Sequence, residues 1–339
     1  MKRNTTRPIA AIFIALLFVA APVLGQQQKL AQTGMKFLSA SLDPKAAALG
    51  DAVTAADGGS EMLFYNPAGM ASQATFMTAS FGQLNWIADI NYNQASVSFA
   101  PKGGRYGVIG FSMLAVDYGE LQGTIRADNE RGYLDTEIFS PSAFGFGIGY
   151  ARALTDRFSV GGHAKFVDQD LGASAMDYNE GDSLVFVDNQ KGVTAFDFGV
   201  LYRTGFKSLT FAFSARNFAK EIKYVDESFQ LPLTLKIGLR MNVFDLTSLG
   251  ASGMHRLNVS VDAENPRDFS EQIKVGAEYV FLDSFALRAG YVVPTDQQGI
   301  NLGAGFYRTV AGVGVGADYA YTDFGIFQAV HRFALRISL

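Results

Sequence analysis

The side chains best suited to chemistry are few in this sequence. It has three histidines and no cysteine among 339 residues. His163, His255 and His331 fall in separate segments, and none has a second histidine at the spacing of a metal site. The lack of cysteine excludes disulfides and every metal or redox centre built on thiolates. We therefore expect ordinary strand histidines, with no metal and no cofactor.

Two glycine runs superficially resemble nucleotide-binding loops. In residues 145–149 and 312–316, glycine alternates strictly with apolar residues and opens no helix, so the dinucleotide-binding fingerprint fails. No Walker sequence and no Gly-x-Ser-x-Gly elbow occurs. A hydrolase would need a serine activated by a histidine beside it, and a sequence does not exclude such a pairing in space. We expect a protein that is not an enzyme.

The composition narrows the class of protein. Apolar residues make up 48% of the chain, aromatic residues 13% and charged residues only 18%, with 36 glycines. Disorder needs low hydrophobicity and high net charge, so it is excluded. The net charge of −4 provides no basic surface for nucleic acid. A large soluble β protein and an outer-membrane barrel remain.

The N-terminus predicts export. Lys2, Arg3 and Arg7 precede an apolar run over residues 9–24, and small residues follow, which is typical of a Sec signal peptide over residues 1–25. An uncleaved anchoring helix is the alternative. Beyond this run no apolar stretch approaches the ~20 residues of a spanning helix, so a membrane location would require strands.

From residue 75 to residue 339 the sequence alternates with a period of two. We predict fourteen strands, at residues 75–82, 90–100, 105–113, 142–152, 157–167, 194–203, 208–217, 231–242, 255–264, 272–281, 284–292, 299–307, 312–320 and 330–339. An even number of segments near ten residues is what a closed antiparallel transmembrane β-barrel needs, because closure pairs every backbone group in lipid. A soluble sandwich could show the same alternation.

Side-chain faces and connection lengths favour the barrel. Phe144, Phe146 and Ile148 alternate with glycines, and charged residues fall on the face opposite the apolar one. The charges expected in the lumen include Lys236, Arg240, Asp262, Glu278, Arg288, Asp318, Arg332 and Arg336. With the N-terminus taken as periplasmic, the outer connections average about 14 residues and the inner turns about 5, as in outer-membrane barrels. The apolar face would contact outer-membrane lipid.

Two of the outer connections are acidic. Residues 114–141 carry a net charge of −4 and residues 168–193 a net charge of −5. A solvated, flexible rim is the first interpretation. A surface that binds a partner or divalent cations is the other.

Residues 26–74 have a different pattern. Asp43 and Pro44 read as the cap and first residue of a short helix that Gly50 ends. A second short helix over residues 60–65 should stop at Asn66, which precedes Pro67. The segment is either a plug in the lumen or a periplasmic tail. Small inward-facing residues leave room for a plug, which a fourteen-stranded barrel is wide enough to need.

Three motifs in this segment carry a family resemblance. Residues 33–38, 43–52 and 64–71 resemble the N-terminal region of the PorV/PorQ family, relatives of the FadL-type long-chain fatty acid transporters. The hatch motif of that superfamily is matched by Asn66, Pro67, Ala68 and Gly69.

The resemblance implies a fourteen-stranded barrel with an N-terminal hatch over residues 26–74. It also implies a role in type IX secretion, in which the type IX translocon and secreted cargo proteins would be the partners. A FadL-like transporter of hydrophobic small molecules is the alternative. The charges expected on the inner face favour a locked hatch over an apolar path.

Overall fold

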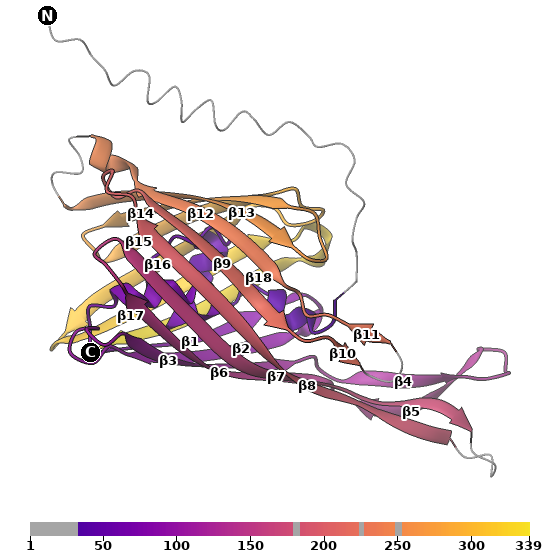
Figure 1. Ribbon diagram of the computed structural model, residues 1–339. Helices are drawn as coiled ribbons and strands as arrows, with labels where there is room; N and C mark the ends of the chain where they lie inside the picture. The colour runs from indigo at the N-terminus through magenta and orange to yellow at the C-terminus, as the bar shows by residue number, and fades with distance from the viewer. Residues whose placement is uncertain (1–32, 179–183, 224–226, 248–252) are drawn as a thin grey trace, which may run out of the picture.

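The computed structural model describes residues 33–178, 184–223, 227–247 and 253–339. Fourteen antiparallel strands close into a barrel (Figure 1), which confirms the predicted fold class. Each strand pairs with its neighbour along the chain, and the first pairs with the last. The barrel strands are β1 (Met77–Asn85), β2 (Asn91–Phe99), β3 (Val108–Asp117), β6 (Ser142–Ala153), β7 (Phe158–Tyr178), β8 (Leu184–Arg203), β9 (Thr210–Ala219), β12 (Thr234–Asn242), β13 (His255–Pro266), β14 (Gln272–Phe281), β15 (Phe285–Val293), β16 (Asn301–Val310), β17 (Val313–Asp323) and β18 (Ala329–Ser338). Short 3₁₀ turns η4 (Ile87–Asp89), η5 (Val243–Leu246) and η7 (Gly325–Phe327) lie in three connections.

The described parts of the acidic connections contain β-strands that the sequence did not indicate, and the flexible rim stays a prediction. The first contains a separate hairpin, β4 (Leu121–Arg126) paired with β5 (Tyr133–Phe139), and the second consists largely of the continued strands β7 and β8. These hairpins project beyond the barrel at lower right in Figure 1. Backbone pairing continues past the wall, where alternation of side chains is no longer required, so the sequence pattern did not reveal it. A third small hairpin, β10 (Ile222–Lys223) with β11 (Ser228–Phe229), lies at the same end.

The wall has an apolar outer face and a small or polar inner face. In β18 the outward side chains of Phe333 and Leu335 are 52% and 62% exposed, whereas the inward side chain of Arg332 is 2% exposed. The same alternation runs through β6, whose glycines face inward and whose aromatic residues face outward. Among the described residues, no helix is long and apolar enough to cross a membrane.

Residues 33–74, which we call the luminal segment, lie inside the barrel. The segment contains η1 (Lys36–Ser39), α2 (Pro44–Ala48), η2 (Ser60–Phe64) and η3 (Pro67–Ser72), drawn in indigo and violet in Figure 1. Asp43 caps α2, because its carboxylate accepts hydrogen bonds from the backbone N–H groups of Lys45 at 2.9 Å and Ala46 at 3.3 Å.

The luminal segment runs through the barrel from end to end. Thr33 pairs with Gln230 in the connection between β9 and β12, at the end that carries the long connections. We call this end the long-connection mouth. Met77 begins β1 beside Leu339 at the opposite end, the short-turn mouth. The first described residues therefore lie at the long-connection mouth. An N-terminus on the periplasmic side would instead enter at the short-turn mouth. The predicted signal peptide, residues 1–25, lies outside the described residues.

Candidate functional site

The hatch motif is buried against the wall of β7 and β8. The Asn66 side chain accepts a hydrogen bond from the Ala68 N–H at 3.1 Å and donates to the carbonyl oxygens of Thr54 at 2.7 Å and Val200 at 3.3 Å. It thus fixes the turn that Pro67 begins and ties that turn to the barrel. Gly69 packs within the luminal segment itself, where an added Cβ would lie 2.7 Å from the Ala56 carbonyl oxygen.

A belt of inward-facing glycines receives the luminal segment. At each of these positions a Cβ would lie closer than 3.0 Å to an atom of the luminal segment, a distance that real Cβ contacts essentially never show. The glycine belt consists of Gly110, Gly149, Gly161, Gly199, Gly238, Gly276, Gly290 and Gly303, on eight strands. Strand alternation indicated inward glycines, but only the tertiary structure shows that each meets a particular residue of the luminal segment.

A continuous chain of ion pairs follows the wall from β12 to β18. Arg240 contacts Glu278 at 2.9 Å, and Glu278 contacts Arg288 at 2.9 Å. Arg288 and Arg336 both contact Asp318, at 2.6 and 2.7 Å. The network joins the luminal segment through Asp43, 2.6 Å from Arg336, through Glu61, 3.0 Å from Arg336, and through Lys45, 4.0 Å from Glu278. Five of the eight charges that we expected in the lumen thus belong to one network of ion pairs.

The other three expected lumen charges contact different parts of the lumen. Lys236 pairs with Glu264 at 2.7 Å, Glu264 also pairs with Lys274, and Lys274 lies 3.7 Å from Asp51 of the luminal segment. Asp262 accepts a hydrogen bond from the Thr54 N–H at 2.9 Å.

Arg332 is the last of the eight. Its guanidinium donates to the Ser41 carbonyl at 2.8 Å and to the Thr322 hydroxyl at 2.8 Å, and it lies over the Trp86 ring. The hatch motif contacts none of the eight charges directly, but Thr54 links it to one of them. The Thr54 carbonyl accepts a hydrogen bond from Asn66, and the Thr54 N–H donates to Asp262.

These cations lower the pKa of Asp51 and Glu61 in the luminal segment, whereas burial outweighs Arg336 and raises the pKa of Asp43. Burial raises the pKa of Asp51, but Lys274 and Lys236 lower it by more, so the pKa lies below its ordinary value. Burial likewise raises the pKa of Glu61, and Arg336 and Lys45 lower it by more. Both groups are therefore ionised at neutral pH, which keeps the ion pairs formed.

An apolar cluster fills the lumen near the long-connection mouth. Phe37, Leu38 and Leu42 of the luminal segment pack there on wall residues that include Leu114 and Val167. Trp86 and Phe324 pack against the same cluster and meet edge to face, with ring centroids 5.1 Å apart. The charge pattern of the inner face did not predict this apolar region, because its residues come from the ends of many strands.

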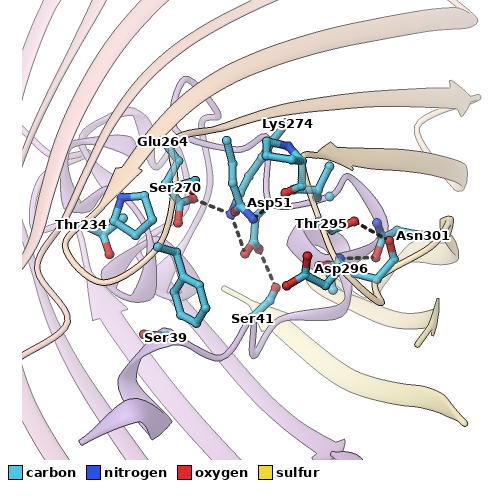
Figure 2. A pocket seen from close by; sticks show the side chains of 18 of the residues that line it. Ser39, Ser41, Asp51, Thr234, Glu264, Ser270, Lys274, Thr295, Asp296 and Asn301 are labelled. Atoms are coloured by element: carbon cyan, nitrogen blue, oxygen red, sulfur yellow. Dashed lines mark hydrogen bonds and ion pairs between the residues drawn. The ribbon is translucent and has the colours of Figure 1, made fainter. Parts of the chain in front are cut away.

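A cavity of about 460 Å³ lies beside this cluster and opens at the long-connection mouth. Figure 2 shows Ser41 and Asp51 of the luminal segment close to Lys274 and Glu264 of the wall, and all four line this cavity. Its apolar lining includes Leu38, Trp86, Val292, Phe269 and Phe324.

A second cavity, of about 450 Å³, lies at the short-turn mouth, lined by Lys45, Arg240, Glu278 and Arg288 among others. On β14, Lys274 lines the first cavity and Glu278 the second, and Gly276 between them meets Leu49. On β12, Gly238 meets Thr54 and Ala55 at the same level. The two cavities are thus separated by one layer of the luminal segment, residues 47–55.

The histidines have unequal surroundings. His255 bonds Tyr279 at 2.7 Å and His331 bonds Tyr319 at 2.8 Å. His163 lies 2.9 Å from both Ser112 and Asp197, a spatial pairing that the sequence had left open. Among the described residues, no three His, Asp or Glu side chains gather as a metal site.

No family model matches the chain, and no curated protein matches it. Solved structures do. The toluene transporter TbuX of Ralstonia pickettii superposes with a TM-score of 0.56 at 12% identity, covering 87% of this chain and 97% of that one. The toluene transporter TodX of Pseudomonas putida gives 0.55 at 11% identity, covering 86% and 96%. A Pseudomonas aeruginosa FadL homologue gives 0.52 at 11% identity, covering 87% and 97%. The resemblance to PorV/PorQ proteins stays a prediction, whereas the fold of this chain, a closed fourteen-stranded barrel, is shared with these solved outer-membrane barrels.

Proposed function

We propose that this chain is an outer-membrane transporter of small hydrophobic molecules, in which the luminal segment acts as the hatch. The arrangement of the two cavities carries the proposal. They lie toward opposite mouths, and residues 47–55 of the luminal segment lie between them. A shift of this one layer would connect the two mouths while η2 and η3 stay in place.

The cavity at the long-connection mouth has one apolar side, and the rest of its lining is polar or charged. It borders the cluster of Phe37, Leu38 and Leu42. Four of the eight charged residues that line it pair with one another: Asp51, Lys236, Glu264 and Lys274. The apolar side of the cavity suits a small molecule with an apolar body, and its polar groups would orient that molecule. The solved barrels with the same fold include two toluene transporters, which supports this class of substrate.

The apolar outer face supports a location in the outer membrane. Exposed side chains such as Phe146, Ile237, Leu287 and Phe333 encircle a closed barrel. A contiguous apolar surface of this extent needs lipid around it.

The sole tryptophan provides the binding test, because Trp86 lines the long-connection cavity. Titration of the detergent-solubilised protein with toluene or dodecanoate should change Trp86 fluorescence and reach saturation. Phe269→Ala, in the cavity lining, should weaken binding by about tenfold or more, which corresponds to the loss of at least about 1.4 kcal/mol. Phe306→Ala is the matched control, since Phe306 is equally exposed (44% for both residues) but lies on β16 in the wall.

Uptake by whole cells completes the test. Cells that make the protein should take up labelled toluene or dodecanoate faster than cells that lack it. A fluorescence response that never saturates, together with equal uptake by both kinds of cell, would refute the transporter.

A second candidate is the PorV/PorQ-type role in type IX secretion. The projecting hairpins favour it, because β5 displays Leu134 and Ile138, 53% and 61% exposed, next to acidic side chains outside the barrel. These residues would bind the translocon or secreted cargo.

Replacing residues 119–140 with a short Gly-Ser turn tests the second candidate. The barrel should still close, because Asp117 and Ser142 are paired across β3 and β6. Co-purification of a translocon barrel or secreted proteins with the parent, lost in this variant, would support secretion. If neither a translocon barrel nor secreted proteins co-purify with the parent, the role in secretion is refuted.

A further inference from the structure

Three buried side chains in the lumen are arranged like a nucleophile, a general base and the acidic residue that orients the base. The Ser112 hydroxyl on β3 lies 2.9 Å from Nε2 of His163 on β7. Nδ1 of the same ring lies 2.9 Å from the Asp197 carboxylate on β8. The three residues are 6%, 4% and 1% exposed. A nucleophile held by a base, which is itself oriented by a third group, is the signature of an activated serine.

A glycine allows the serine and the histidine to meet. Strand β6 runs between β3 and β7, and its Gly147 lies directly opposite Ser112. A Cβ on Gly147 would lie 2.2 Å from His163 Nε2 and 2.9 Å from the Ser112 hydroxyl. Only a residue without a side chain leaves the space between strands through which Ser112 and His163 touch.

The carboxylate is fixed from several sides. His163 and Asp197 are directly opposite in the register of β7 and β8. The carboxylate also accepts hydrogen bonds from the Asn217 N–H at 2.7 Å and from Lys165 at 2.7 and 2.8 Å. With the Nδ1 proton donated to Asp197, the free Nε2 lone pair accepts the Ser112 proton, which is the tautomer that a general base needs.

A small cavity adjoins the serine. It has a volume of about 30 Å³, enough for a water molecule. Its apolar lining comes from the luminal segment and the wall: Leu38, Leu42, Leu63, Phe64, Leu114 and Val167. Lys165 and Arg216 also line it; Lys165 is bonded to Asp197, and Arg216 is the second cation at the cavity. Apolar walls suit an acyl chain, and cations stabilise the oxyanion formed when a serine attacks an ester.

We propose that Ser112, His163 and Asp197 form a serine nucleophile site that hydrolyses carboxylic esters of apolar acyl groups. The Ser112 oxygen bonds to the carbonyl carbon while its proton passes to Nε2 of His163. The ester C–O bond then breaks, and His163 gives this proton to the departing alkoxide, which leaves as an alcohol. Water attacks the acyl-serine, His163 transfers one water proton to the Ser112 oxygen, and a carboxylic acid leaves.

The site is covered in the closed state. Leu38 and Leu42 of the luminal segment form one side of the small cavity, so an acyl chain enters when they shift. Leu38→Ala combined with Leu42→Ala removes apolar volume from this cover and leaves the three site residues unchanged. This double variant should react faster than the parent.

The first measurement is covalent labelling of the full-length barrel in detergent with an alkyl fluorophosphonate, located by mass spectrometry. Label should appear on Ser112, faster in the Leu38→Ala/Leu42→Ala protein. His163→Gln should slow labelling by about 10²–10⁴-fold, because general base catalysis is lost. Gly147→Ala should slow it comparably while keeping both reacting groups. Gly162→Ala is the matched control, since an added Cβ there meets only the Asp197 carbonyl oxygen, at 3.9 Å.

The second measurement is release of p-nitrophenolate from p-nitrophenyl hexanoate, which should depend on Ser112 and His163. Heat-modifiable migration in gels verifies that each variant has a closed barrel. The proposal is overturned if Ser112 stays unlabelled in closed barrels of both the parent and the Leu38→Ala/Leu42→Ala protein. Labelling that His163→Gln does not slow, or labelling without any p-nitrophenolate release, overturns it equally. These experiments measure reaction at Ser112 and not uptake of a substrate. A negative result would therefore refute the hydrolase site without refuting the transporter.

Discussion

At the scale of single residues, the lumen is organised by cations that serve more than one carboxylate. Arg336 is the clearest case, because it contacts Asp318 in the wall and both Asp43 and Glu61 in the luminal segment. A buried ion pair contributes little net stability relative to apolar packing, but removing one partner leaves the others as unpaired buried charges. Such residues therefore determine how firmly the luminal segment is held.

Arg336→Gln should loosen the luminal segment without opening the barrel. Loss of the cation should cost about 3–5 kcal/mol of its attachment, because the buried carboxylates of Asp43 and Glu61 lose their ion-pair partner. Limited proteolysis of the folded protein should then cut within residues 33–74, where the parent resists. Arg152→Gln, at an exposed position, is the control and should leave the segment protected. Equal protection of Arg336→Gln and the parent would show that the ion pairs do not hold the segment.

At the scale of elements, the alternation of side chains along each strand gives the wall an apolar outer face and an inner face that accommodates the luminal segment. Outward positions present large apolar side chains, and many inward positions are glycine, so the wall is thin where the luminal segment approaches it. Gly290 is the tightest approach to the layer between the cavities, since a Cβ there would lie 2.2 Å from backbone atoms of Leu49 and Gly50. Backbone atoms at this distance cannot move aside as easily as the end of a flexible side chain can.

Gly290→Ala should displace residues 49–50 and join the two cavities. In planar bilayers this variant should show larger or more frequent conductance steps than the parent. Gly162→Ala, where no atom lies closer than 3.9 Å, is the control and should conduct like the parent. Unchanged conductance of Gly290→Ala would mean that this layer is not the barrier.

The last strand tests the outer face. Leu335 is 62% exposed and pairs with Phe81 of β1 and Ala317 of β17, at the closure of the barrel. Leu335→Arg should prevent assembly, because a cation on the lipid face near the bilayer midplane costs about 2–4 kcal/mol. Leu246→Arg, at an exposed position in η5 outside the strands, should assemble normally. A Leu335→Arg protein that reaches the outer membrane heat-modifiable and protease-resistant would contradict the assignment of this face to lipid.

At the scale of the whole molecule, a closed wall surrounds the luminal segment, and residues 47–55 of that segment lie between the two cavities. Transport would then need movement of residues 47–55 but none of η2, whose Ser60 hydroxyl lies 2.9 Å from that of Ser96 on β2. The chain has no cysteine, so engineered pairs form without competing disulfides.

Ser60→Cys with Ser96→Cys should give a disulfide that fastens η2 to the wall and leaves uptake of dodecanoate unchanged. Ser80→Cys with Ser96→Cys is the matched control, because Ser80 lies opposite Ser96 within the wall and the cross-link does not touch the luminal segment. Uptake that is lost on oxidation of the first pair and restored by reductant, with no effect on the second, would show that η2 must move too.

The sequence by itself determined the wall. Alternation must hold over every strand whose two faces meet lipid and lumen, so the number of strands, their order and the faces of residues such as Phe333 and Arg332 follow from local spacing. The cap at Asp43 and the turn at Asn66 could be predicted for the same reason, because each depends on neighbours within three residues.

Only the tertiary structure decided what the inward residues meet. The glycine belt, the ion pairs of Arg336 and the contact of Ser112 with His163 join positions tens to hundreds of residues apart, at distances set by strand register and by the path of the luminal segment. A period of two tells which way a side chain points but not which strand residue stands beside it across the lumen. The projecting hairpins escaped prediction because beyond the wall no lipid imposes that period, and backbone pairing continues without it.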